Sequence, residues 1–316
     1  MLQLLAAMPG AIAQGLIWGV MAIGVYITYK VLDIADLTVD GSICTGAAVC
    51  TVLLLNGRSI WLAMLCAVLA GVLAGTVTGL LHVLLGIPPI LAGILTQMVL
   101  WSVNLKILGK ANQALPARSL KVLLSQMDVT GALPVLLAVC AVLCILLVLF
   151  FGTELGCALR ATGCNPVMSR AQGVNTQLMK VLGLALSNGV VALSGALLCQ
   201  YQGYADVNMG RGAVVIGLAA VVIGQAVLGR WSVRMAVQLG GVALGAVIYY
   251  IVYQVIIFAG FDTDLLKMFS AIVVAVFLGV PYLKQEAKAR IRAGKGGSGH
   301  AENEYHHQDL QQRHRG

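Results

Sequence analysis

Three aspartates, Asp33, Asp36 and Asp40, flank the start of an interrupted apolar run within residues 30–40. Carboxylates are costly to bury among apolar side chains, and interrupted helices often form the solute sites of membrane transporters. The same residues also suit a structural role, since Asp36 or Thr38 can cap a helix N-terminus and Asp40 suits a first helical turn. The sequence leaves both interpretations open.

Amide side chains interrupt the later apolar stretches and are further candidates for lining a solute pathway. Each of them can either line a pore or form a hydrogen bond between two helices. Together with the residues above, the pathway candidates are Asp36, Thr38, Asp40, Gln97, Asn188, Gln200 and Asn208.

The sequence offers little that could support catalysis. His82 is the only histidine inside an apolar stretch, and no serine or cysteine motif accompanies it. The chain has no GxxxxGK[ST] motif for nucleotide phosphates and no CxxC pair for zinc or redox chemistry. We therefore expect no enzymatic activity, no metal site and no cofactor on this chain.

The composition indicates a membrane protein. Of the 316 residues, 59% are apolar and 10% are charged, whereas a soluble domain carries roughly 25% charged residues. Several uncharged apolar stretches reach about 18 residues, the length that crosses a bilayer as a helix. We expect an all-α, polytopic bundle of transmembrane helices, and we do not expect nucleic-acid binding.

Eight or nine membrane spans are predicted, one of them broken or re-entrant. Nine full spans would place the N-terminus outside, and eight would place it inside. The spacing of Gly71, Gly75 and Gly79 predicts a smooth helix face on which a neighbouring backbone packs closely. The predicted spans are 11–29, 37–55, 60–85, 88–108, 132–152, 177–200, 213–229, 234–258 and 265–283.

Lysine and arginine residues follow the last predicted span and assign the C-terminus to the cytosol. The predicted division is a membrane domain at 1–283 and a basic, disordered cytosolic tail at 284–316. Counting back from the tail places residues 153–176 in the cytosol and residues 109–131 outside. Lys110, Arg118 and Lys121 in this external loop oppose the positive-inside rule, so either they dock an external acidic protein or the loop is a tolerated local exception to the rule.

Residues 153–176 form a polar stretch between two spans, with the sequence ELGCALRATGCNPVMSRAQGVNT from Glu154. Its first apolar residues can form one side of a short helix that stops at Gly163. Asn165 and Pro166 can start a second helix, because proline is tolerated in a first turn. The stretch is expected either to offer a short surface helix to another protein or to be a solvated loop.

This stretch resembles the cytosolic coupling motif of ABC-importer permeases of the branched-chain amino acid, ribose and nucleoside group, whose form is close to ALRATGxNPxMARAxGI. The resemblance extends over residues 13–24, 34–46, 87–109 and 182–224. The last two segments are most similar to permeases of tryptophan/tyrosine-type uptake systems. Cys164 and Gln225 stand where relatives often carry Asp and Glu, which puts a salt bridge to the ATPase at Cys164 in doubt.

The resemblance implies a permease subunit in the bacterial cytoplasmic membrane that takes up a small amino-acid-like solute, with an aromatic amino acid favoured. It implies a second permease copy, two ATPase subunits carrying ATP and magnesium, and a periplasmic or lipoprotein solute-binding protein. The alternative is a self-sufficient secondary transporter or channel. The residues implied to contact the ATPase are Glu154, Arg160, Ala161, Thr162, Gly163, Asn165 and Pro166.

Overall fold

The computed structural model describes residues 2–116, 123–126, 129–228 and 234–258, with isolated positions between 268 and 279. Contacts divide the chain into two compact units, residues 1–270 and 271–316, and every element named below belongs to the first. Apart from those isolated positions, the predicted span 265–283 lies outside the described residues. The predicted tail 284–316 lies outside them entirely.

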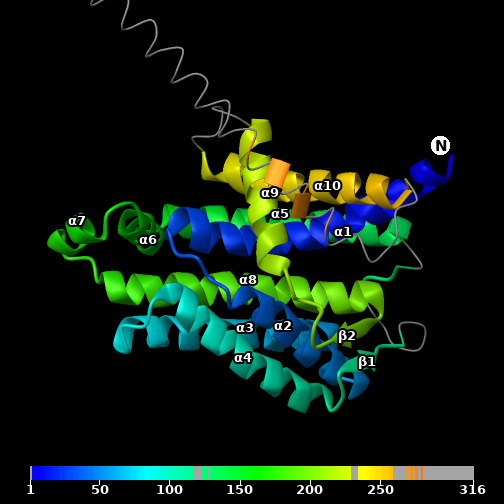
Figure 1. Ribbon diagram of the computed structural model, residues 1–316, viewed down its shortest axis with the longest axis horizontal. Helices are drawn as coiled ribbons and strands as arrows, with labels where there is room; N and C mark the ends of the chain where they lie inside the picture. The colour runs from blue at the N-terminus through cyan, green and yellow to red at the C-terminus, as the bar shows by residue number, and fades with distance from the viewer. Residues whose placement is uncertain are drawn as a thin grey trace, which may run out of the picture. The chain divides into compact units, whose positions relative to one another are not determined.

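The described part of the chain is helical, with one small sheet (Figure 1). Its helices coincide with the predicted spans, although the first begins earlier than expected. The elements are α1 (Leu2–Tyr26), the π-helix η1 (Ile27–Val31), α2 (Val39–Leu55), α3 (Ile60–Leu84), α4 (Pro89–Leu108), β1 (Asn112–Ala114), α5 (Val129–Gly152), α6 (Glu154–Cys164), α7 (Pro166–Ala171), α8 (Thr176–Gln202), β2 (Tyr204–Asp206), α9 (Ala213–Leu228) and α10 (Met235–Phe258).

Six of the described helices are long and apolar enough to cross a membrane: α1 with η1, α3, α4, α5, α8 and α10. Helices α2 and α9 are also apolar but shorter, with 17 and 16 residues. The described residues therefore form a polytopic helical membrane protein, as predicted. The count of eight or nine spans stays a prediction.

Helix α8 lies at the centre of this unit and contacts α1, α2 and α3 (Figure 1). Its contact with α3 depends on glycine. A Cβ added at Gly71 would lie 2.3 Å from the Asn188 carbonyl oxygen, and one at Gly75 would lie 2.2 Å from that of Leu184. The prediction of a close-packing glycine face is therefore confirmed.

Helix α1 connects two ends of the unit. Near its start, the Cβ position of Gly10 lies 3.9 Å from the Tyr201 hydroxyl, close to where α8 ends and β2 begins. At the other end, the Val31 carbonyl of η1 lies against Gly163 of α6. The start of α1 and helix α6 are thus at opposite ends of this unit, and the side of the membrane on which the N-terminus lies stays a prediction.

The small sheet was not predicted. Strands β1 and β2 pair antiparallel, with Asn112 opposite Asp206 and Ala114 opposite Tyr204. Both segments lie between predicted spans, and a strand of three residues is too short to show an alternating pattern in the sequence. The pairing ties two loops together at the end of the unit opposite α6.

Helices α2 and α9 both begin inside the unit. The chain leaves η1, passes through residues 32–38 and starts α2 beside Asn188, near the middle of α8. The first turn of α9 lies beside Asp40 of α2, and α9 then crosses α1 steeply (Figure 1). The interruption predicted within residues 30–40 is therefore present.

Candidate functional site

Helices α6 and α7 form a compact surface element joined through a single residue. Asn165 ends α6 and caps α7, because its side-chain Oδ1 accepts a hydrogen bond of 3.0 Å from the Met168 amide. Pro166 occupies the first turn of α7, as predicted. Gly163 does not stop α6, which continues to Cys164. The prediction of a stop was wrong, because this glycine provides close packing instead of a turn.

The base of α6 is fixed to the membrane helices. A Cβ on Gly163 would lie 1.9 Å from the Val31 carbonyl oxygen, so α6 and η1 touch backbone to backbone. Leu159 is fully buried, and Arg160 donates a hydrogen bond of 3.1 Å to the Phe151 carbonyl oxygen. Any displacement of α6 must therefore move η1 as well.

The seven residues predicted to contact the ATPase divide into two groups. Glu154, Arg160, Ala161, Asn165 and Pro166 are exposed. Thr162 is buried, and Gly163 is half-buried and packs against η1. ATPase contact stays a prediction for all seven positions.

A buried hydrogen-bond network holds the start of α2. Asp36 accepts hydrogen bonds from the Thr38 amide at 2.8 Å and from the Asn188 side chain at 2.7 Å. Ser42 donates to Asn188 at 2.6 Å, and the hydroxyls of Thr38 and Thr78 lie 2.8 Å apart. Asp36, Thr38 and Asn188 thus connect the segment before α2 to α3 and α8.

Asp40 caps a helix other than its own. It lies in the first turn of α2, but its carboxylate accepts hydrogen bonds from the Gly212 and Val214 amides at 3.0 and 2.9 Å. These amides belong to the start of α9, where a helix has unpaired N–H groups and partial positive charge. The sequence predicted a role for Asp40 within the first turn of its own helix, and this bond to the start of α9 was not predicted.

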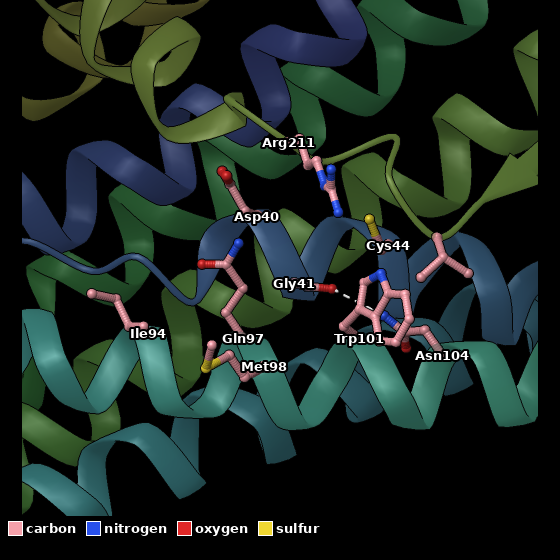
Figure 2. A pocket seen from close by; sticks show the side chains of 10 residues that line it. Asp40, Gly41, Cys44, Ile94, Gln97, Met98, Trp101, Asn104 and Arg211 are labelled. Carbon is pink, nitrogen blue, oxygen red and sulfur yellow. Dashed lines mark hydrogen bonds between the residues drawn. The ribbon is translucent and has the colours of Figure 1, made fainter. Parts of the chain in front are cut away.

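A cavity of about 470 Å³ opens between α2, α4 and the segment 207–211 (Figure 2). Two of the predicted pathway residues, Asp40 and Gln97, line it. Asn208 is exposed beside the cavity, where its side chain accepts a hydrogen bond of 3.4 Å from Trp101. The lining residues are Asp40, Gly41, Cys44, Ile94, Gln97, Met98, Trp101, Asn104, Val207 and Arg211.

Other predicted residues lie away from this cavity. Gln200 is buried and accepts a hydrogen bond of 3.1 Å from the Leu123 amide. Lys110 is exposed just before β1, whereas Arg118 and Lys121 lie outside the described residues. Trp101 and Arg211 also line the cavity and were not predicted from the sequence. The spacing of Ile94, Met98 and Trp101 along one helix face could have indicated the first.

Within the part of the chain that the structure describes, no three His, Cys, Asp or Glu side chains lie close enough together to hold a metal ion. The described cysteines are all free thiols.

Comparison with known proteins places the chain among transport permeases. The family model of the branched-chain amino acid transport system permease component matches residues 8–280. A tyrosine transport system permease protein of Clostridioides difficile strain R20291 is 39% identical over 279 residues, covering 87% of this chain and 91% of the relative. An uncharacterised protein of Rickettsia prowazekii strain Madrid E is 31% identical over 278 residues, covering 87% and 97%.

Among solved structures, PsaBC from Streptococcus pneumoniae in complex with a Fab matches with a TM-score of 0.36 and 15% identity. The match covers 78% of this chain and 89% of that one. The family match spans nearly all of the predicted membrane domain, and it decides between the importer and the secondary transporter. The chain belongs to the branched-chain amino acid transport system permease family and is the membrane-spanning permease component of an ABC importer.

Proposed function

We propose that this permease imports an aromatic amino acid, which an external binding protein delivers and two ATPase subunits drive across the membrane. The 39% identity to a tyrosine transport permease supports the solute class. Membership of the family supports an ATPase and a binding protein as partners. ATP and magnesium would bind on the ATPase, and a second permease copy would complete the assembly.

The membrane is the bacterial cytoplasmic membrane, with the α6–α7 end and the C-terminus in the cytosol. This orientation follows the basic residues after the last predicted span. It places β1, β2 and Lys110 on the external face, where the binding protein would dock. Arg118 and Lys121 belong to the same external loop and would add positive charge for an acidic partner.

The exposed tip of α7 is the observation that carries the coupling role. Val167 is 79% exposed and Met168 is 62% exposed, although both are apolar. A buried base and an exposed apolar tip suit a rigid knob that inserts into a groove of another protein. We assign ATPase contact to this tip together with Glu154, Arg160, Ala161, Asn165 and Pro166, and we assign anchoring to Thr162 and Gly163.

Coupling would pass from α6 into the interrupted segment. Gly163 touches Val31, and residues 32–38 then lead to the start of α2. A movement of the ATPase would shift α6 and η1 together and change the position from which α2 begins. The ATPase drives transport only if it binds the two positions of α6 with different free energies.

The test is Val167→Asp in the full chain, expressed with its ATPase partner. A buried, unpaired carboxylate at an interface is strongly unfavourable. We expect co-purification of the ATPase and ATP-dependent uptake to fall at least about tenfold, which corresponds to roughly 1.4 kcal/mol. The permease should keep its thermal stability, because Val167 makes few contacts within its own chain.

The matched control is Gln177→Asp, which places the same side chain at an exposed position in the first turn of α8. An acid is favourable near a helix N-terminus, so this variant should keep both the ATPase and uptake. If Val167→Asp retains the ATPase as fully as the control does, α7 is not the coupling site.

A further inference from the structure

The cavity between α2 and α4 contains two opposite charges that the coupling role does not use. Asp40 contributes a carboxylate from α2, and Arg211 contributes a guanidinium from the segment before α9. Figure 2 shows the Arg211 side chain extending from that segment toward Cys44 and Trp101. Within the described residues, the Arg211 guanidinium has no hydrogen-bond or ion-pair partner. It is therefore available to an anionic group.

The carboxylate of Asp40 keeps capacity for a ligand although it caps α9. Its two oxygens accept from the Gly212 and Val214 amides. Two carboxylate oxygens offer about four lone-pair sites, so sites remain for a further donor. The capping bonds also fix the carboxylate in place at the wall of the cavity. A cationic donor in the cavity would complete its coordination.

Helix α4 supplies the apolar wall. Ile94, Met98 and Trp101 recur at helical spacing along the face that lines the cavity (Figure 2). An indole ring and a thioether are favourable partners for an aromatic ring. This wall suits an apolar or aromatic side chain.

Asn104 adds an independent indication of a ligand. It lies one turn beyond Trp101, lines the cavity and is fully buried. Its Nδ2 donates to the Gly41 carbonyl at 3.4 Å, whereas its Oδ1 has no hydrogen-bond partner. A buried acceptor without a donor is costly. A hydroxyl or ring N–H on a bound solute could satisfy it.

We propose that this cavity is a solute subsite on the permease itself, in which Arg211 binds the α-carboxylate and Asp40 the α-ammonium of an amino acid. Its aromatic side chain lies along Met98 and Trp101, and Asn104 accepts a hydrogen bond from the ring substituent. This subsite rests on the proposed function, because it is a site within the permease at which the imported amino acid binds.

The arrangement favours weak binding with chemical selectivity. Arg211 is exposed, so water screens its attraction for a carboxylate. A pathway site must also release its solute. Selectivity instead comes from matching three groups of one molecule at once, and removing any one of them should lower the affinity.

The experiment measures competition for tritiated L-tyrosine bound to the full chain in lipid nanodiscs, without the ATPase or binding protein. Tyramine lacks the carboxylate, 3-(4-hydroxyphenyl)propionate lacks the ammonium, and L-phenylalanine lacks the phenol hydroxyl. Losing a hydrogen bond to a charged group weakens binding about tenfold or more. Tyramine and the propionate should therefore each bind about tenfold more weakly than tyrosine to the wild-type chain.

Arg211→Gln is the decisive variant, because it should weaken tyrosine and the propionate but leave tyramine unchanged. Arg58→Gln is the matched control, since Arg58 is exposed between α2 and α3 and does not line the cavity. Asn104→Leu should remove the preference for tyrosine over phenylalanine. Asp40→Asn could disturb α9, so the proposal does not depend on that variant.

An unchanged ratio of tyrosine to tyramine affinities in Arg211→Gln would overturn the subsite, as would an equal loss for all probes. Failure of the subsite and failure of the importer are distinguishable. Val167→Asp should abolish ATP-dependent uptake while tyrosine binding to the permease stays at the wild-type level. A wild-type chain that supports uptake but binds no tyrosine leaves the importer standing and removes the subsite.

Discussion

The α3–α8 contact and the α2–α9 contact belong to the same membrane unit, yet they are held in opposite ways. Gly71 and Gly75 let the backbone of α3 lie directly against the carbonyl groups of α8. In contrast, α9 is attached to α2 through the carboxylate of one residue, Asp40. The first contact is close backbone packing, to which His82 and Lys180 add one polar side-chain pair at 3.4 Å. The second is polar and borders a cavity.

The difference indicates which part of the permease is fixed and which part can rearrange. Within a bilayer there is little hydrophobic drive between helices, so close backbone packing and hydrogen bonds supply the attraction. A glycine face fits only one arrangement, and sliding α3 along α8 would lose the fit. Two hydrogen bonds to a carboxylate can be exchanged for others as α9 moves. We therefore expect α3 and α8 to move as one body during transport.

The largest effect should come from filling the glycine face with Gly75→Val. Its Cβ would lie 2.2 Å from the Leu184 carbonyl oxygen, so the two backbones must separate. Overpacking of this kind costs about 3 kcal/mol. We expect a corresponding loss of stability in detergent unfolding, with uptake lost in proportion to folded protein.

Gly240→Val in α10 is the control, because a Cβ there meets nothing within 4 Å. It should leave the unfolding midpoint near the wild-type value. Equal destabilisation by the two variants would show that valine propensity, and not the α3–α8 contact, determines the cost.

A smaller effect is expected at the polar contact from Asp40→Ala. Removing a helix cap costs about 0.5–2 kcal/mol, and the upper end applies because the Asp40 carboxylate accepts from two amides. Uptake should fall further than stability does, since the start of α9 loses its fixed position. Unfolding and uptake are measured on the same preparation.

Asp206→Ala removes a carboxylate that, among the described residues, accepts a hydrogen bond only from the Asn208 amide in its own turn. It should change stability by less than about 1 kcal/mol. If Asp206→Ala reduces uptake as much as Asp40→Ala does, the α2–α9 contact has no special role in transport.

The glycine contact of α3 could be predicted from sequence, whereas the contact between α2 and α9 through Asp40 could not. Glycine at every fourth position of a long apolar segment indicates a close contact with a neighbouring helix. The positions of the membrane helices follow equally directly, because apolar length and polar breaks determine them. Asn165 and Pro166 marked the start of α7 for the same local reason.

Asp40 shows why the remaining part could not be predicted. Its position in the first turn of α2 suggested a local role, but the amides it binds are more than 170 residues further along the chain. The place of Arg211 in the cavity could not be predicted either, since nothing near it in sequence indicates that it lies beside α2 and α4. Gly163 shows the opposite error. A local sequence rule predicted that the helix ends there, but the position needs a small residue because the Val31 backbone lies against it.

The smallest effect should appear in the network that joins the two kinds of contact, at Ser42→Ala. Ser42 donates to Asn188 across the α2–α8 interface at 2.6 Å, and a hydrogen bond of this kind contributes about 1 kcal/mol. Thr45→Val is the control, because Thr45 is also buried in α2 but donates only to the Gly41 carbonyl of its own helix. If both variants unfold at the same denaturant concentration, the start of α2 is held by packing alone. If only Ser42→Ala is destabilised, the hydrogen bond to Asn188 ties the start of α2 to the body formed by α3 and α8, so a shift at the start of α2 is passed on to that body.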